Sequence, residues 1–344
     1  MALNVVNFDT LEWQEYPGGG GVRFEARWAP LADRLGARKL GCGSWIVPPG
    51  KASVPYHYHL VNEELAIVLG GEIWVRLDGR FHRLEAGDAV ALPPGPDSAH
   101  QFLNHGDRPA HLLLASTKIP REVVGYPDSG KRMMVVAGLA GDPPMERVLM
   151  KDGRVLESPA AYFEGEPIDE PLGDPPAAAA ARDPRIVRFD DLPWEPYRVG
   201  PFGAERRRVA RAAGARRLGY GLYRVAHGGR PWPFHFHHVN EEFFYVRSGY
   251  GQLRHRDGTA DLHPGDAFAC PPGPAGAHAV FDTGDAPLEL FALSTMEEPE
   301  VTEYPDSDKL NVLVGSAPGG DPAERSVSAV FRRADHVPYE EGER

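Results

Sequence analysis

The sequence predicts an all-β protein made of two copies of one small barrel or sandwich, and three observations support this. The chain has 344 residues, which is long for one domain and comfortable for two domains of about 170 residues each. Its 39 glycines and 34 prolines make up about a fifth of the residues, against a usual share of about 12%. The apolar runs between them are short, and the sequence repeats itself at a fixed distance. This pattern favours short strands and tight turns.

The repeat extends over most of the chain. The segment PYHYHLVNEELAIVLGG, beginning at Pro55, is repeated as PFHFHHVNEEFFYVRSG, beginning at Pro233, and we call the distance between these two prolines the repeat offset. The same offset relates GDAVALPPG at Gly87 to GDAFACPPG at Gly265. A repeat of this length indicates one supersecondary unit used twice, so we expect two halves with the same fold.

Within each copy, the local pattern is that of β-strands. Ile73, Val75 and Leu77 alternate with polar residues, the Asp78-Gly79 pair is a two-residue turn signal, and an apolar run returns after it. These features predict a β-hairpin. Further short runs recur at spacings of about 8–12 residues, as is typical of a sandwich or barrel.

The two copies are separated by a segment of different composition. The stretch IDEPLGDPPAAAAARDP is rich in proline, alanine and aspartate and has no apolar periodicity, so it is interpreted as a linker. We therefore expect an N-terminal barrel over residues 1–168, a linker over 169–184 and a C-terminal barrel over 185–344.

Composition excludes several classes of function. The formal net charge of −12 disfavours binding to nucleic acid or to an anionic membrane surface. No apolar stretch approaches the roughly 18 residues that span a bilayer. The cysteines, Cys42 and Cys270, cannot build a disulfide framework and are expected in the core. The N-terminus has no leader pattern, so a cytoplasmic location is expected.

Histidines in the repeat suggest a metal site. Two residues that stand two positions apart on a strand point to the same face of the sheet. Each copy contains a His-X-His pair followed at the same distance by a carboxylate. These candidate ligands are His57, His59 and Glu64 in the first copy, and His235, His237 and Glu242 in the second.

The choice of carboxylate depends on the second copy. In the first copy, Glu63 and Glu64 each stand seven residues before a glycine, whereas in the second only Glu242 does so, before Gly249. Glu64 and Glu242 are therefore the predicted ligands. Glu63 and Glu241 are expected to face solvent or to contact the ligands from outside.

A fourth donor is expected from a distant strand, because three ligands from one corner leave a metal open on too many sides. His100 and His278 fit, since each lies five residues beyond the glycine of a PPG turn. Three imidazoles and one carboxylate suit Mn, Fe, Co, Ni or Zn. The sequence thus predicts up to two divalent transition metals per chain.

These residues resemble the cupin superfamily. Its motif G(X)5HXH(X)3,4E(X)6G is matched from His57 to Gly71 and from His235 to Gly249, with Gly50 one residue too far upstream. Its motif G(X)5PXG(X)2H(X)3N is matched from Gly87 to Asn104 and from Gly265. Both copies have four residues between the last glycine and the histidine, and Asp282 replaces the asparagine. The strings HYHxxNEE, PPGxxxxH and YPDSxK are similar to those of a bacterial cupin family, here as a bicupin.

The resemblance implies two tandem double-stranded β-helix barrels, also called jelly rolls, each with one metal. Cupins include oxalate oxidases and decarboxylases, dioxygenases, sugar isomerases, and storage and sensory domains. The leading hypothesis is a small-molecule enzyme of the dioxygenase, oxidase or decarboxylase type, acting on a metabolite that chelates the metal through carboxylate or hydroxyl groups. A homo-oligomer is compatible with the family.

Two alternatives stay open. A metal-dependent binding or sensor protein without catalytic activity would carry the same ligands. Isomerase chemistry on a sugar is the other alternative, but the sequence shows no evident phosphate cradle.

The two copies differ around their predicted sites. Side chains on a strand alternate between its two faces, so residues two and four positions after a ligand point to the same side as that ligand. Ala66 and Val68 therefore point inward in the first copy, and Phe244 and Val246 point inward in the second. We therefore expect a narrower, more apolar second pocket, with different ligands in the two barrels or catalysis in only one. The arginine-rich run over 205–217 is expected to form a solvated strand face or an interface rather than an anion site.

Overall fold

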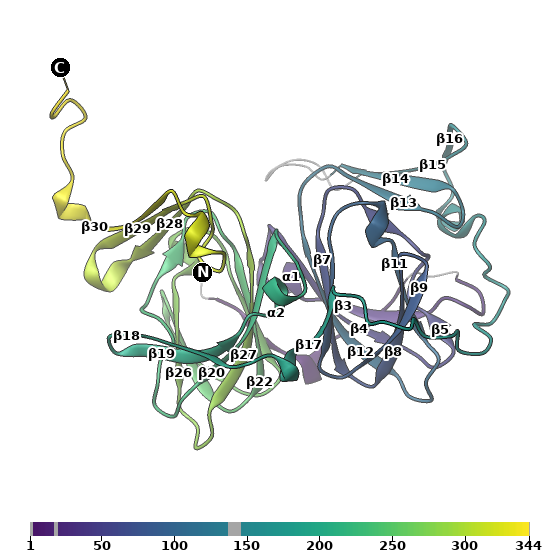
Figure 1. Ribbon diagram of the computed structural model, residues 1–344, viewed down its shortest axis with the longest axis horizontal. Helices are drawn as coiled ribbons and strands as arrows, with labels where there is room; N and C mark the ends of the chain where they lie inside the picture. The colour runs from purple at the N-terminus through teal and green to yellow at the C-terminus, as the bar shows by residue number, and fades with distance from the viewer. Residues whose placement is uncertain (1–2, 17–19, 137–145, 344) are drawn as a thin grey trace.

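The computed structural model describes residues 3–16, 20–136 and 146–343, which form two similar β-rich halves lying side by side (Figure 1). The α-helices among these residues are short: α1 (Leu31–Leu35) and α2 (Val209–Ala212). None of the helices in the described part of the chain is long and apolar enough to cross a membrane. The all-β prediction is confirmed.

Three antiparallel sheets form the first half, where a sheet of seven strands packs against a sheet of four and a third has five. The seven-stranded sheet runs β17 (Ile186–Arg188), β10 (Asp88–Leu92), β7 (Glu64–Gly70), β12 (Ala110–Thr117), β4 (Leu40–Val47), β3 (Ala26–Pro30) and β2 (Gln14–Tyr16). The four-stranded sheet runs β5 (Lys51–Ala52), β11 (His100–Asn104), β8 (Glu72–Leu77) and β9 (Arg80–Glu85). The third runs β16 (Arg154–Leu156), β15 (Glu146–Lys151), β14 (Lys131–Val136), β13 (Glu122–Tyr126) and β6 (Tyr58–His59).

The second half repeats this arrangement. Its seven-stranded sheet runs β1 (Val5–Asn7), β25 (Asp266–Cys270), β22 (Glu242–Ser248), β27 (Leu288–Thr295), β20 (Leu218–Val225), β19 (Phe202–Arg207) and β18 (Glu195–Val199). The smaller sheets run β24 (Gly258–Leu262), β23 (Gly251–His255) and β26 (His278–Asp282), and β21 (Phe236–His237), β28 (Glu300–Tyr304), β29 (Lys309–Val314) and β30 (Val327–Arg332). The first residues of β7 and β22, like those of β12 and β27, are separated by the repeat offset of the sequence.

Local turn chemistry explains two features of the motif. The hairpin between β8 and β9 turns at Asp78 and Gly79, whose φ angles of 48° and 74° are those of a two-residue hairpin turn. The glycine that follows the predicted carboxylate ligand also has a positive φ, 74° at Gly71 and 81° at Gly249. A Cβ atom at Gly71 would stand 2.7 Å from the carbonyl oxygen of Pro109. Glycine therefore serves here to turn the chain tightly after β7.

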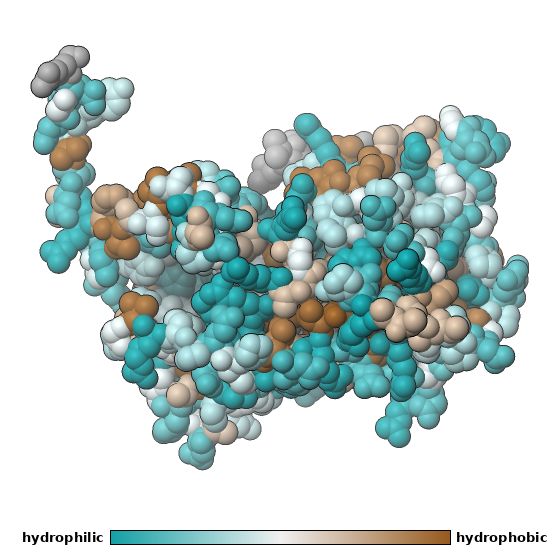
Figure 2. All heavy atoms as spheres, in the orientation of Figure 1, coloured by the Kyte–Doolittle hydropathy of each residue, from teal (hydrophilic) through white to brown (hydrophobic). Residues whose placement is uncertain are grey.

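Each half has an apolar interior. Ala66 and Val68 of β7 lie in the core of the first barrel, and Phe244 and Val246 of β22 lie in the core of the second, as parity predicted. The face shown in Figure 2 is mainly hydrophilic, and its hydrophobic patches are small and separate. The main apolar clusters therefore lie inside the barrels and between them.

A third core joins the two halves. Leu65 and Ile67 point to the opposite face of β7 from Ala66, and that face is also fully buried. They belong to one cluster with Phe243 and Phe291 of the second half, and α1 and α2 contribute to the same cluster. The two seven-stranded sheets are thus packed on one another through a continuous apolar layer, so the halves are not independent units joined only by a linker.

The halves also exchange their opening strands. Strand β1, at the start of the chain, pairs with β25 of the second half, with Val6 opposite Ala267. Strand β17, which follows the predicted linker, pairs with β10 of the first half, with Val187 opposite Ala89. Figure 1 accordingly shows the N-terminus beside the second half. Assigning residues 1–168 and 185–344 each to its own barrel did not anticipate this reciprocal exchange.

Two buried carboxylates fasten the halves together, which corrects the expectation that Glu63 and Glu241 face solvent or the ligands. Their side chains are almost completely buried. Glu241 accepts hydrogen bonds from the backbone N–H groups of Arg38, Lys39 and Leu40 at 2.7–2.9 Å. Reciprocally, Glu63 accepts from the backbone of 216–218 at 2.6–3.1 Å. Each carboxylate therefore caps the start of a strand in the other half. Each also stands one residue before a predicted ligand of its own half.

Candidate metal centres

The predicted ligands of each half come from three places in the fold. In the first half, His57 forms an isolated antiparallel bridge with His100 at the start of β11, while His59 lies on β6 and Glu64 begins β7. The bridge is closed by backbone hydrogen bonds of 3.1 and 2.7 Å between His57 and His100. Because bridge partners face one another, the fourth histidine is brought beside the first despite the longer loop before it.

The four side chains of the first half converge. The Oε2 atom of Glu64 lies 3.4 Å from Nε2 of His59 and 3.2 Å from Nε2 of His100. The rings of His57 and His100 are 4.4 Å apart between centroids, and one ligand atom from each of His57, His59 and Glu64 lies within 4.8 Å of the others.

The second half repeats this geometry closely. The Oε2 atom of Glu242 lies 3.4 Å from Nε2 of His237 and 3.3 Å from Nε2 of His278. His235, His237 and Glu242 again form a compact group, and the rings of His235 and His278 are 4.6 Å apart. The structure therefore brings together all eight residues that the sequence singled out, as two separate clusters of four.

Backbone carbonyl groups orient most of these imidazoles. Nδ1 of His235 lies 2.9 Å from the carbonyl oxygen of Pro233, and Nδ1 of His278 lies 2.9 Å from that of Gly276. His57 and His100 make the equivalent contacts in the first half at 2.9 and 3.0 Å. A carbonyl can only accept, so each Nδ1 carries the proton and each Nε2 keeps a free lone pair, as in histidines that ligate metals.

The donor set fits a divalent metal. Oε2 of Glu242 and Nε2 of His278 are buried and have no hydrogen-bond partner among the described residues, although they face each other at 3.3 Å. A lone pair and a carboxylate oxygen repel one another unless a cation lies between them. Two donors about 2.1 Å from one metal, at an angle of about 90–110°, would stand about 3.0–3.4 Å apart. The separations in both clusters fall in that range.

The electrostatics of each cluster treat its imidazoles differently, because some lie near the carboxylates and others lie near other histidines. Burial, together with the neighbouring histidines, holds the pKa of His57 and His235 well below the ordinary value. At His237, burial disfavours the imidazolium, but the carboxylates of Glu242 and Glu300 raise the pKa to about 10. Glu242 is buried, yet the neighbouring imidazoles lower its pKa to about 2. Without a metal, a proton on His237 supplies the positive charge that the cluster requires.

A second carboxylate beside each site was missed by the sequence reasoning. Oε2 of Glu122 lies 3.5 Å from Nδ1 of His59, and Oε2 of Glu300 lies 3.5 Å from Nδ1 of His237. Glu300 is also bonded by the backbone N–H groups of residues 238–240 at 2.8–3.3 Å, which fixes the loop after the His-X-His pair. Glu122 and Glu300 are themselves related by the repeat offset, so the repeat carried the signal.

The second cluster opens into a cavity of about 770 Å³. His235, His237 and Glu242 lie in its wall with Tyr223 and Trp232. The wall also contains five arginines, namely Arg206, Arg207, Arg208, Arg211 and Arg216. The second pocket was expected to be narrower and more apolar, but these five arginines line it. Phe244 packs 5.2 Å from the His278 ring and belongs to the core of the barrel. The arginine-rich run over 205–217 was expected to form a solvated strand face or an interface. Arg216 and Arg217 do bond Glu63 of the other half, and five arginines of the run also line this cavity.

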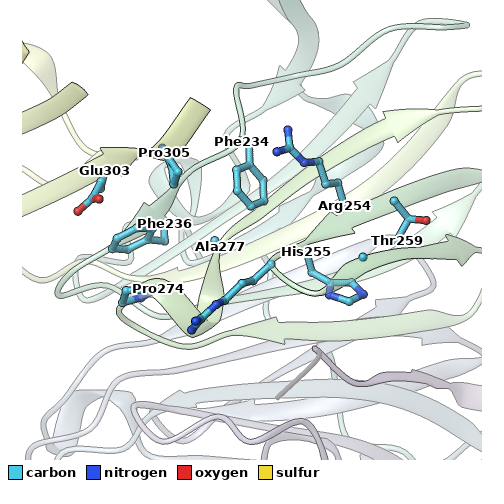
Figure 3. Close-up of a pocket in the computed structure, with 11 residues that line it drawn as sticks. Phe234, Phe236, Arg254, His255, Thr259, Pro274, Ala277, Glu303 and Pro305 are labelled. Carbon is cyan, nitrogen blue, oxygen red and sulfur yellow. The ribbon is translucent and has the colours of Figure 1, made fainter. Parts of the chain in front are cut away.

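Another cavity, of about 560 Å³, lies outside the same barrel (Figure 3). It is lined by Phe234 and Phe236, which alternate along the strand with the ligands His235 and His237 and so point away from them. Arg254 stacks on the Phe234 ring at 4.0 Å. None of the eight candidate ligands lines this cavity, so it is separate from the candidate metal centre.

Comparison with known proteins agrees with this architecture. The family described as the Cupin domain matches residues 43–116 and again residues 221–294, and each match contains all four candidate ligands of its half. The chain belongs to the cupin superfamily. Because the match occurs twice, this cupin is a bicupin with two tandem domains.

Individual relatives are more distant. The bicupin is 34% identical over 112 residues to protein SchB of Streptomyces halstedii, covering 32% of this chain and 76% of SchB. It is 32% identical over 96 residues to polyketide synthase CurC of Streptomyces cyaneus, and the match spans 28% of this chain and only 60% of CurC. An oxalate decarboxylase from Lactobacillus farciminis superposes with a TM-score of 0.50 at 17% identity, covering 86% of each chain. This likeness shows the shared fold.

Proposed function

We propose that this bicupin is a metal-dependent enzyme of oxidative or lyase type, and that its substrate is a small metabolite that chelates the metal through carboxylate or hydroxyl oxygens. One observation carries the proposal. In the second half, imidazole Nε2 atoms converge on a carboxylate oxygen that has no hydrogen-bond partner among the described residues, at the wall of a cavity of about 770 Å³. Such a cavity is large enough for a metabolite.

A bound divalent metal would supply a Lewis acid with exchangeable positions for a chelating substrate. His235, His237, Glu242 and His278 would hold it, and Glu300 would fix the orientation of His237. Phe244 and Trp232, whose rings lie 5.8 Å apart, exclude water from one side of the cluster. The protein residues thus provide a shaped, partly dry site open to the cavity.

Tyr223 is the candidate for orienting a substrate oxygen. Burial raises the pKa of its hydroxyl, and the negative charge of Glu242 acts in the same direction, so the phenol stays protonated at neutral pH. It lines the cavity and lies opposite Arg206 on the neighbouring strand, whose positive charge lowers the pKa of the hydroxyl only in part. A protonated phenol beside the metal ligands can donate to a carbonyl or carboxylate oxygen of the substrate.

The first experiment is elemental analysis of protein purified without a chelating resin and then supplied with divalent metals. Two metals per chain are expected for the native protein, and one for each of the single variants His59→Ala and His237→Ala. Less than one metal per native chain after repletion would refute the two-site proposal.

Turnover separates an enzyme from a binding protein. Oxygen consumption and product formation are measured with hydroxy acids, keto acids and phenolic polyketides, the last because two relatives are named as polyketide synthase proteins. We expect loss of turnover in His237→Ala and a smaller loss in His59→Ala, since the arginine-lined cavity adjoins the second cluster. Equal rates in the two variants would contradict different roles for the barrels, and stoichiometric binding without turnover would favour a sensor.

A further inference from the structure

One wall of the cavity in the second half is cationic, and this charge is specific to that half. Arg206 lies near the end of β19, Arg208 precedes α2, and Arg211 lies within α2. At the repeat offset, the first half has Trp28, Pro30 and Asp33 in their places. Three guanidinium groups therefore stand where the other copy has neutral or acidic residues, in a protein whose net charge is −12.

The charge of this arginine wall, defined as Arg206, Arg208 and Arg211, is incompletely balanced. Arg208 pairs with Glu195 at 3.0 Å through its Nε atom, and Nε of Arg206 lies 3.9 Å from the same carboxylate oxygen. That Nε atom of Arg206 is buried and lacks a hydrogen-bond partner among the described residues. Two guanidinium groups thus depend on one half-exposed carboxylate, which leaves donors available for another anion.

The loop between β29 and β30 covers the same cavity. Gly315, Gly319 and Gly320 line it, and Asp321 joins the loop to the wall through an ion pair with Arg211 at 2.9 Å. Arg325 donates to the carbonyl oxygens of residues 316–318. Burial and the positive charge of Arg208 lower the pKa of Arg325.

We propose that the arginine wall binds an anionic group, a carboxylate or a phosphate, at the end of the substrate remote from the candidate metal. Guanidinium groups suit both anions because their planar forks bond two oxygens at once. The wall and the cluster line one cavity, with Tyr223 and Trp232 between them, whose rings are 5.5 Å apart. The substrate class is therefore a metabolite with a chelating end, a short middle portion that contacts aromatic rings, and a second anionic end.

The shape of the site favours a small anion over a polyanion. The arginines line a concave cavity beneath a loop, whereas a nucleic acid needs an extended basic surface. The inference rests on the proposed function in one respect, namely that the bound anionic group belongs to the substrate of the metal site. Binding of an anion to the wall can be tested without any metal.

The test is calorimetric titration of metal-free, full-length protein at low ionic strength with inorganic phosphate, with succinate and with uncharged succinamide. We expect phosphate or succinate to bind and succinamide not to bind, and the tighter of the two anions identifies the group. Arg208→Gln and Arg211→Gln are each expected to raise the Kd by roughly tenfold or more, because each removes a charged hydrogen bond. Arg27→Gln, an exposed position on β3 of the first half, is the matched control and should leave the Kd unchanged.

Melting temperatures are measured alongside to check that each variant is folded. Arg208→Lys keeps the positive charge but loses the planar guanidinium group, so it should bind the anion with an intermediate Kd. Wild-type protein that binds neither anion, or Arg208→Gln and Arg211→Gln proteins that bind as tightly as wild type, would overturn the inference. Metal content is determined separately. Arginine-dependent anion binding in a protein that takes up no metal would refute the proposed function and leave the arginine wall intact.

Discussion

The buried carboxylate of Glu241 provides the sharpest test of how the two halves are held together. It accepts hydrogen bonds from three consecutive backbone N–H groups, those of Arg38, Lys39 and Leu40, and its side chain is fully buried. In Glu241→Ala these donors lose their acceptor. A buried unsatisfied donor costs about 1–3 kcal/mol, so three would cost about 3–9 kcal/mol. Water entering the vacated space satisfies part of this demand, so we expect about 3–5 kcal/mol.

The expected change is large enough to measure. With an unfolding entropy of about 2.1 cal/mol/K per residue, a chain of this length has about 0.7 kcal/mol/K, and the melting temperature should fall by about 4–7 °C. Urea unfolding followed by circular dichroism and by tryptophan fluorescence gives the free energy directly, provided that the two probes coincide. Glu241→Gln keeps one acceptor oxygen and should lose less than Glu241→Ala.

Glu297→Ala is the matched control in the same interface. Glu297 pairs with Lys39 at 2.7 Å, but both side chains are exposed by more than a third, so the loss should stay below about 1 kcal/mol. If Glu241→Ala were no more destabilised than Glu297→Ala, the buried carboxylate would not be what joins the halves, and the reasoning would be refuted.

Three further predictions concern the clusters. Glu300→Gln should weaken metal binding at the second site by about 10–100-fold, and Glu122→Gln should weaken it to the same extent only at the first site. Competition with a chelator measures both affinities. An equal effect of either variant at both sites would contradict the assignment. In metal-free protein, the carboxylates of Glu242 and Glu300 outweigh burial and raise the pKa of His237 from 6.5 to about 10, so its stabilising contribution is complete below pH 6.5 and is lost as pH rises through 10. The melting temperature in EDTA should fall across that interval, and a His237→Gln protein with the same slope would speak against it. Metal binding must displace that proton, so the affinity of the second site should rise with pH, as isothermal titration at pH 6 and pH 8 would show; an affinity that fell with pH would argue against a protonated His237.

Much of the fold was predictable because the sequence contains the same structural unit twice. The repeat offset separated Glu64 from Glu63 as a ligand and paired His100 with His278, and the Asp78-Gly79 turn located the hairpin. These conclusions depend on strand parity and turn chemistry, which are local properties.

The features that could not be predicted depend on which part of the chain packs against a given face of a strand. Parity places Glu63 opposite Glu64, but it does not reveal that the other half supplies backbone donors there. The arginines at 206, 208 and 211 would suit a solvated surface equally well. Their sequence does not reveal that the loop after β29 lines a cavity together with them. Glu122 and Glu300 are a duplicated pair of carboxylates, so the repeat does contain a signal for them.

The exchange of β1 and β17 bears on how such a chain could have arisen. The two seven-stranded sheets, each completed by the opening strand of the other, have the reciprocal relation of subunits in a symmetric dimer with swapped arms. A single-copy ancestor would have to find its partner by diffusion, whereas the fused chain meets it at the high effective concentration set by residues 169–184. Fusion also allows the sequences of the two halves to diverge. Such divergence would explain why the two clusters match while the arginine wall occurs beside the second one.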